Sequence, residues 1–209
     1  MERLAAALNR AGTATVRRAL LHGRPHLVAP ARLIVPGVLA GSLGPLLYAA
    51  GEVAKTVTAW NHVPLLVNHP PRPGQSGRDP EVLEAQGVGV LLNARLGPTG
   101  ELDGEAWFDE ARLRAVDVRV LNALAAGRPL EVSTGLYLDR AEAPPGSVHN
   151  GVAYTHVASN YRPDHLAVLP DAVGACSRKD GCGLLVNGRT CPSCAPLTTN
   201  GGPPMPLTA

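Results

Sequence analysis

Short runs of alternating apolar and polar residues recur along the chain, and this period of two predicts mainly β-structure. The clearest run predicts a strand over residues 130–138. Its apolar residues fall on one face: Leu130, Val132, Leu136 and Leu138. Ser133 then points to the opposite face, and Gly135 leaves the backbone beside it open to close approach.

Other short apolar segments, bounded by turn residues, predict further strands over 27–29, 33–35, 63–69, 87–96, 101–108, 152–158 and 165–169. Pro30 separates the first two, which indicates edge strands because proline cannot donate to a central ladder. Alternation along the third places His69 at the end of an apolar face. The next two flank a Gly-Pro-Thr-Gly turn at 97–100 and predict a hairpin. Asp164 begins the last strand.

Residues 109–127 have the clearest helical spacing. Their apolar positions form one stripe: Leu113, Val116, Val120 and Leu124. Asp109 is suited to cap the start of this helix and Gly127 to end it. Shorter helices are predicted over 49–60 and after Asp79-Pro80, and a weakly amphipathic helix followed by a loop is predicted over residues 1–25.

About seven strands and two or three helices, which do not alternate one for one, predict an α+β fold. We expect a mainly antiparallel sheet that forms a closed or nearly closed barrel, with the helices packed outside. The predicted domain organisation is an N-terminal arm (1–25), the barrel domain (26–178) and a flexible tail rich in Cys, Gly and Pro (179–209).

The chain has 209 residues, of which 45% are hydrophobic and only 3% aromatic, so one domain with an aliphatic core is expected. A formal net charge of +2 gives no reason to expect a nucleic-acid or membrane-surface partner. No apolar run approaches the roughly 20 residues of a membrane-spanning helix. Polar residues interrupt the N-terminus at Arg3, Asn9 and Arg10, unlike a signal peptide. A soluble intracellular protein is therefore expected.

Nucleophilic catalysis requires a nucleophile, a base that accepts its proton and a group that orients the base. Ser133 is suited to the first role and His69 to the second, because imidazole titrates near neutral pH. Either His165 or Asp164 is suited to the third. Each histidine taken alone is better explained as a structural group, because lone histidines at strand ends more often have that role.

Three blocks of the sequence carry these residues in order: VPLLVNHPP (63–71), LEVSTGLY (130–137) and NYRPDHLAVLPDAVGACS (160–177). They resemble the blocks of tailed-phage prohead proteases, which are capsid maturation serine proteases related to the herpesvirus assemblins. The resemblance spans roughly residues 26–178. It implies a seven-stranded barrel surrounded by helices, with Ser133, His69 and His165 as the catalytic residues.

Two positions depart from the family pattern. Many phage members have glutamate where His165 stands, and the histidine resembles the Ser-His-His arrangement of the assemblins instead. Assemblins also carry an arginine in the loop after the third strand, whereas residues 171–175 contain none. Backbone N–H groups near Gly174 would then have to hold the oxyanion, with Gly135 allowing close approach.

The resemblance implies a serine endopeptidase that cleaves phage scaffold and major capsid protein precursors, and also itself. It would act inside the assembling prohead in the bacterial cytoplasm. No cofactor, nucleic-acid partner or membrane partner is implied, and association of several copies of the chain is left open. The alternative is a non-catalytic scaffold or shell protein of the phage head that retains the barrel.

The four cysteines of the chain lie near its end: Cys176, Cys182, Cys191 and Cys194. Four thiolates are the right number for a structural zinc, and the last two form a Cys-x-x-Cys pair. The first two are separated by five residues, which is wider than usual for a zinc pair. A reduced tail is therefore expected, and a zinc-stabilised binding module is the weaker alternative.

Overall fold

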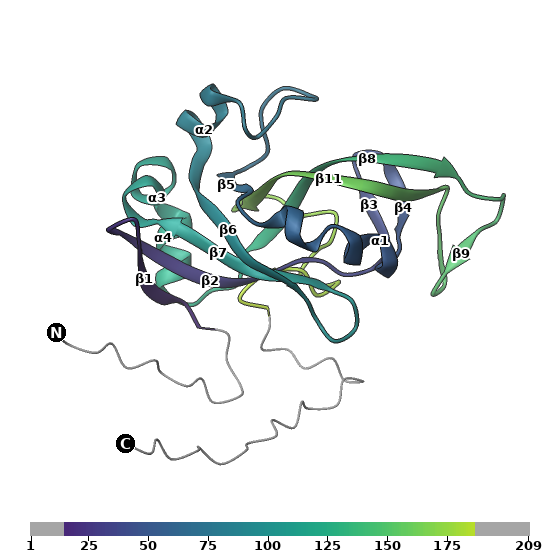
Figure 1. The fold of residues 1–209 in the computed structure, drawn as a ribbon, viewed down its shortest axis with the longest axis horizontal. Helices are drawn as coiled ribbons and strands as arrows, with labels where there is room; N and C mark the ends of the chain where they lie inside the picture. Colours follow the sequence, from purple (N-terminus) through teal and green to yellow (C-terminus); the bar gives the residue numbers. More distant parts are fainter. Residues whose placement is uncertain (1–14, 187–209) are drawn as a thin grey trace, which may run out of the picture.

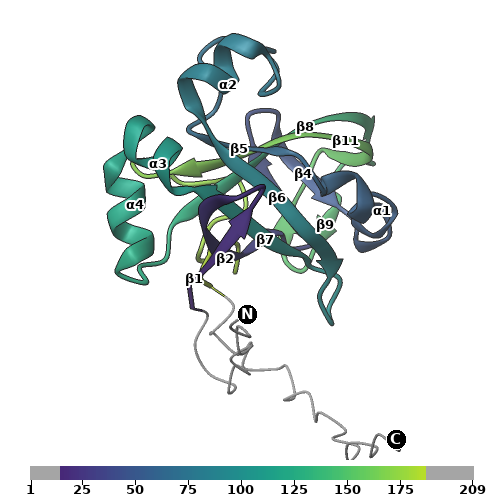
Figure 2. The same ribbon diagram turned by 60° about the vertical axis from the view of Figure 1, so that its left-hand side comes forward.

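A ten-stranded mixed sheet forms the centre of the computed structural model, which describes residues 15–186 (Figures 1 and 2). The strands are β1 (Arg17–Leu21), β2 (Arg24–Ile34), β3 (Gly37–Gly41), β4 (Gly44–Tyr48), β5 (Pro64–Val67), β6 (Gly87–Leu96), β7 (Leu102–Asp109), β8 (Glu131–Glu142), β11 (His156–Leu169) and β12 (Gly183–Leu184). A separate pair, β9 (Val148–His149) and β10 (Val152–Ala153), forms a small second sheet.

The main path of the sheet runs β1-β2-β7-β6-β5-β11-β4-β3, with β8 beside β11 and β12 beside β2. Most pairs are antiparallel, but β11 is parallel to both β4 and β5. The predicted α+β class is confirmed. The predicted closed or nearly closed barrel is wrong, because only one isolated bridge, Leu130 to Leu184, connects the start of β8 to β12. A single bridge leaves the sheet open.

The β2 strand is continuous where two short strands were predicted, although Pro30 lies in its middle. On one side β2 pairs with β7 along most of its length. On the other side, β1 reaches only as far as Val28 and β12 begins at Ala31. Pro30 falls between them, and its carbonyl accepts from Leu185 N at 2.9 Å on the β12 side. Its missing N–H therefore breaks no ladder hydrogen bond.

The β11 strand is also continuous where two strands were predicted. It pairs with β8 from His156 to Leu169, with register shifts between Ser159 and Arg162 and between Pro163 and His165. At the second shift, Pro163 lies opposite Leu136 and His165 opposite Gly135, so Asp164 is an extra residue without a partner on β8. Such a bulge redirects side chains locally. Asp164 therefore lies within the strand and does not begin it.

The helices are α1 (Ala50–Lys55), the 3-10 helix η1 (Val57–Trp60), α2 (Pro80–Gln86), α3 (Glu110–Val116) and α4 (Val118–Ala125). The helix predicted over 109–127 is divided into α3 and α4. Asp109 caps α3 as expected, accepting from Ala111 N and Arg112 N. Asp117 is extended (φ −155°, ψ 100°), and its side chain caps α4 by accepting from Arg119 N. A second N-cap residue thus divides the predicted helix in two, although the apolar stripe continues from one part to the other.

Residues 17–21 form strand β1, whereas a helix and a loop were predicted in this part of the chain. A tight turn at His22 and Gly23, both with positive φ (48° and 74°), connects β1 to β2. Two consecutive residues of positive φ are typical of a type I′ hairpin. The rest of the predicted arm, residues 1–14, lies outside the described residues.

The core is aliphatic, as expected, with Trp60 and Phe108 as its large fully buried aromatic side chains. In Figure 1, α3 and α4 lie at the end of the molecule near β1 and β2, and the long β8–β11 ribbon extends to the opposite end. Within residues 15–186, every helix is too short or too polar to cross a membrane. The ends of β5, β8 and β11 meet near the centre, where the candidate site lies.

Candidate active site

His69 leaves the sheet directly after β5. Asn68 adopts a left-handed conformation (φ 64°), and its N–H still donates to Val168 O at 2.9 Å. This change of direction ends the alternation from which the position of His69 was predicted. The amide of Gln86, at the end of α2, donates to Val67 O and His69 O at 3.0 and 3.2 Å. The main chain at His69 is therefore held from both sides.

The two histidines of the predicted site are in direct contact. His69 Nδ1 and His165 Nε2 are 2.8 Å apart, and the two rings meet edge to face with centroids 5.0 Å apart. His165 is only 5% exposed, whereas His69 lies at the rim of a pocket. Residues 96 positions apart in the chain thus form one hydrogen-bonded pair.

Asp164 extends this pair into a series of three groups. Its Oδ2 lies 2.7 Å from His165 Nδ1, so it contacts the second histidine and not His69. The carboxylate also accepts from Ser76 Oγ at 2.5 Å and from Gly77 N at 2.6 Å. Burial alone would raise the pKa of Asp164, but these hydrogen bonds outweigh it and lower the pKa below its ordinary value. The carboxylate is therefore ionised at neutral pH.

The direction of each hydrogen bond follows from this charge. An ionised carboxylate only accepts, so His165 carries its proton on Nδ1 and, when neutral, presents an acceptor at Nε2. His69 must then donate from Nδ1 to His165. The remaining nitrogen, Nε2 of His69, carries no proton and is an acceptor. Burial, followed by the neighbouring His165, lowers the pKa of His69 to about 4, so the ring is neutral at pH 7.

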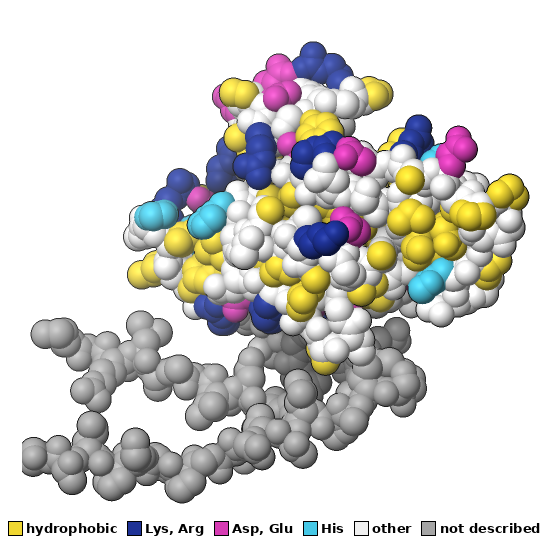
Figure 3. All heavy atoms as spheres, turned by 45° about the vertical axis from the view of Figure 1, so that its right-hand side comes forward, with side chains coloured by type: hydrophobic (Ala, Val, Ile, Leu, Met, Phe, Trp, Pro, Cys, Tyr) yellow, Lys and Arg dark blue, Asp and Glu magenta, His cyan; other side chains and the backbone are white. Residues whose placement is uncertain are grey.

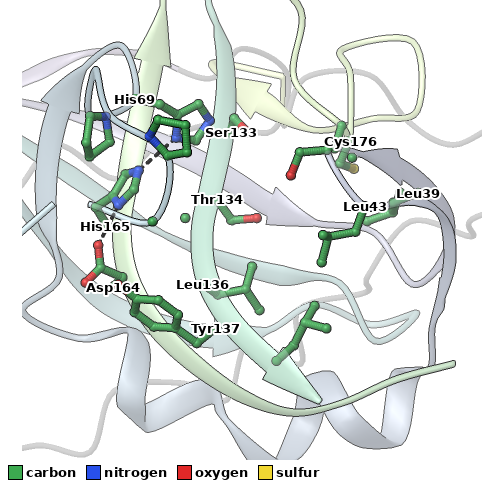
Figure 4. A pocket seen from close by; sticks show the side chains of 18 of the residues that line it. Leu39, Leu43, His69, Ser133, Thr134, Leu136, Tyr137, Asp164, His165 and Cys176 are labelled. Carbon is green, nitrogen blue, oxygen red and sulfur yellow. Dashed lines mark hydrogen bonds and ion pairs between the residues drawn. The ribbon is translucent and has the colours of Figure 1, made fainter. Parts of the chain in front are cut away.

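Ser133 lies on β8, half-buried, and lines the same pocket as His69, His165 and Asp164. In the view of Figure 4, the His69 ring lies between Ser133 and His165. Within residues 15–186, no hydrogen bond joins Ser133 to His69. Catalytic hydrogen bonds are often longer in an unliganded enzyme than in its substrate complex.

Glycines allow His165 to occupy its position. A Cβ atom at Gly135 would overlap the His165 ring, and one at Gly77 would lie 2.6 Å from its Cβ, Cγ and Nδ1 atoms. The ring is thus enclosed between β8 and the loop that follows His69. Gly135 was predicted to allow close approach of a substrate, and in this structure the group that approaches it is His165.

Gly174 lies in the loop after β11, where a Cβ atom would overlap the carbonyl oxygen of Val132. This close contact brings the loop against the backbone next to Ser133. Val173 and Ala175 line the pocket. The loop therefore borders the candidate nucleophile, although it carries no cation.

The pocket has a volume of about 710 Å³ and lies between β8, the β3–β4 hairpin and the loop after His69. Toward the hairpin the lining is aliphatic, with Leu39, Leu43 and Leu136 (Figure 4). Leu46 and Leu138 also line the pocket. On the face seen in Figure 3, apolar side chains gather toward the end of the molecule that carries the β8–β11 ribbon. The volume is within the range of ligand-binding clefts.

Cys176 and Cys182 form a disulfide, with Cα atoms 5.5 Å apart and both residues buried. Neither sulfur is then available as a thiolate, so the four-cysteine zinc site is wrong, as is the expectation that these two cysteines are reduced. Cys191 and Cys194 lie outside the described residues. Within the described part of the chain, no three potential metal ligands come together.

Ser76 and Gly77 are parts of the site that were not predicted from the sequence. They lie in the loop between β5 and α2, whose proline and glycine content indicated only a connection. Nothing local to this loop shows that it contacts a residue of β11, 87 to 88 positions away.

No family model matches this chain, and no curated protein matches it in sequence. Among solved structures, the chain is similar to the bacteriophage T4 capsid assembly protease, gp21, with a TM-score of 0.49 and 12% identity. The match covers 75% of this chain and 93% of that chain. A structural similarity this low does not establish a function, which therefore depends on the chemistry of the site itself.

Proposed function

We propose that this chain is a serine endopeptidase, with Ser133 as the nucleophile and His69 as the general base. The observation that carries the proposal is the series His69–His165–Asp164, which borders the same pocket as Ser133. Its hydrogen bonds leave His69 Nε2 as an unprotonated acceptor. This is the state that a base needs in order to activate a serine hydroxyl.

The reaction has two halves. Ser133 Oγ attacks the carbonyl carbon of the scissile peptide bond while its proton passes to His69 Nε2. His69 then gives this proton to the leaving amine, and the C–N bond breaks to leave an ester on Ser133. Water, deprotonated by the same nitrogen, attacks the ester, and the proton returns to Ser133 as the acid product leaves.

The groups behind His69 stabilise the charge that it acquires. Once protonated, His69 still donates from Nδ1 to His165, whose own Nδ1–H faces the Asp164 carboxylate. The negative charge of the tetrahedral intermediate also favours the imidazolium, because the opposite charges are close together. The low pKa of His69 in the free site therefore does not prevent proton transfer during the reaction.

Backbone N–H groups of the loop after β11, near Gly174, are our candidates for the oxyanion donors. This loop packs against Val132, the residue before the nucleophile. Two or three preorganised donors of this kind account for several kcal/mol of transition-state stabilisation in serine hydrolases. No side-chain cation is needed for this role.

Phage scaffold and capsid precursors, together with the chain itself, are the proposed substrates, inside the assembling head of the phage. The support for this is the resemblance of the three blocks at 63–71, 130–137 and 160–177, each of which contributes at least one member of the proposed site. A non-catalytic head protein is the second candidate. It is favoured by the missing hydrogen bond between Ser133 and His69.

A fluorophosphonate probe and a cleavage assay distinguish the two candidates. The wild-type chain should be labelled at Ser133, which mass spectrometry can assign, and should shorten its scaffold or capsid precursor when coexpressed with them. Ser133→Ala should lose both activities, since it removes the attacking oxygen. Ser147→Ala is a matched control, because this half-buried serine does not line the pocket and its hydroxyl donates to Pro144 O. An unlabelled wild type that cuts nothing would favour the non-catalytic candidate.

A further inference from the structure

We propose that Ser76 is a positioning residue that fixes the Asp164 carboxylate and thereby sets which nitrogen of His165 and of His69 carries a proton. This inference rests on the proposed peptidase function, but it concerns the chain's own proton arrangement. Ser76 does not line the pocket, so it acts through Asp164 and not on a substrate.

The Ser76 hydroxyl has one direction in which to donate. Its oxygen accepts from Arg78 N at 3.0 Å and lies 2.5 Å from Asp164 Oδ1. Since the ionised carboxylate cannot donate, the hydroxyl proton must point to Asp164. Short hydrogen bonds to a charged group are among the stronger ones in proteins.

The two oxygens of Asp164 are used differently. Oδ1 accepts from Ser76, whereas Oδ2 accepts from Gly77 N and His165 Nδ1. Ser76 is therefore the only described group that hydrogen-bonds to Oδ1, the Asp164 oxygen that does not contact His165. Without it, the carboxylate could turn about its side-chain bond, and the contact with His165 would lose its fixed geometry.

The β-bulge makes this support necessary. Asp164 is the extra residue on β11 and has no partner on β8, so the ladder does not fix its direction. The loop from His69 to α2 fixes the direction of this side chain instead. It holds Asp164 through Ser76 and Gly77, and its backbone at Gly77 packs directly on the His165 ring.

The consequence for catalysis depends on which ring nitrogen of His165, and then of His69, carries the proton. If Asp164 no longer holds the Nδ1 proton of His165, that ring can carry its proton on Nε2 and point it toward His69. His69 Nδ1 must then accept, which leaves its only proton on Nε2. In this state His69 cannot take the proton of Ser133. A serine in a loop on the far side of two imidazoles would thus control whether the base is available.

The test compares Ser76→Ala with Ser76→Thr, which keeps the hydroxyl, and with Ser147→Ala as the control. Nitrogen and proton NMR of the full-length chain reports which nitrogen of each histidine is protonated. We expect Nδ1–H on both His69 and His165 in the wild type, Ser76→Thr and Ser147→Ala. In Ser76→Ala a share of Nε2–H should appear on both rings.

Peptide-cleavage kinetics should follow the same order. Ser76→Ala should lower kcat about 10- to 100-fold with little change in KM, the size expected for a hydrogen bond to a charged group. Ser76→Thr should restore most of kcat. A folded Ser76→Ala with wild-type tautomers and kcat would overturn the proposal, and so would equal losses in the alanine and threonine variants. If the wild type cleaves nothing but Ser76→Ala alters the tautomers, the positioning role stands and the peptidase function fails.

Discussion

The two sides of the pocket differ in how far they are organised before a substrate arrives. On the base side, His69, His165 and Asp164 are joined by hydrogen bonds of 2.7 and 2.8 Å and are anchored by a loop at Ser76 and Gly77. On the nucleophile side, the Ser133 hydroxyl makes no hydrogen bond within the described part of the chain, although its backbone belongs to the β8–β11 ladder. Its neighbouring loop is held by backbone packing at Gly174 and by a disulfide.

This difference indicates how much each side has to reorganise during the proposed reaction. The base side is preorganised, so little reorganisation is needed when His69 becomes charged. The nucleophile side has a free hydroxyl and an exposed loop residue, Val173, which is 72% exposed. In the proposed mechanism, a substrate that covers this loop would exclude water from the space around Ser133. The contrast can be tested by perturbing each side separately.

The largest effect is expected from the base itself. His69→Ala should reduce kcat/KM by about 10⁴-fold or more, because the un-ionised serine hydroxyl is a poor nucleophile. His165→Ala should cost less, roughly 10²- to 10³-fold, because it orients His69 and transfers no proton. Single-turnover cleavage of one peptide by both variants measures the difference. His149→Ala, at an exposed hairpin, serves as the control. Equal losses for His69 and His165 would contradict the assignment of a base and an orienting group.

The pH dependence should show the state of the base side. With a His69 pKa of about 4, kcat/KM should change little between pH 7 and pH 5 and fall below about pH 4, where the protonated ring can no longer accept. A fall centred near pH 6.5 would instead indicate a base with an ordinary pKa.

Folding stability should change over the same region of pH. The unfolded chain binds a proton at His69 near pH 6.5, whereas the folded chain binds it only near pH 4. The unfolded state therefore holds more protons between these values, and stability should fall as the pH is lowered through this window. Asp164, whose folded pKa is also lowered, should add to this loss at more acidic pH. Urea unfolding of the wild type and His69→Gln at pH 7 and pH 5 measures the contribution, which should be smaller in the variant.

How much of this molecule is predictable from its sequence depends on whether a pattern is local. Alternation over 130–138 and 87–108 correctly predicted strand β8 and the β6–β7 hairpin, and the α+β class followed from such elements. The continuity of β2 was not predictable, because Pro30 is tolerated only where β1 has ended and β12 has not begun. That gap is a property of three strands together.

The same limit applies to the site. Ser133, His69 and His165 were singled out from strand ends and from the three blocks, and the structure brings all three to one pocket. The order of the groups was left open between His165 and Asp164. It depends on a bulge that removes Asp164 from the ladder, and on a loop that supplies Ser76. Neither the bulge nor the loop contact follows from any window of the sequence.

The smallest effect is expected from the disulfide on the nucleophile side. Cys176→Ser with Cys182→Ser opens a loop that spans only six positions, for which the chain-entropy relation gives about 2 kcal/mol of unfolding free energy. The base side lies on other elements, so the pH profile should keep its wild-type shape while kcat falls only a few-fold. Denaturant unfolding and peptide cleavage, each with and without a dithiol reductant, separate the two effects. A change in the pH profile of the double variant would show that the loop and the histidines are coupled, and the contrast between the two sides would fail.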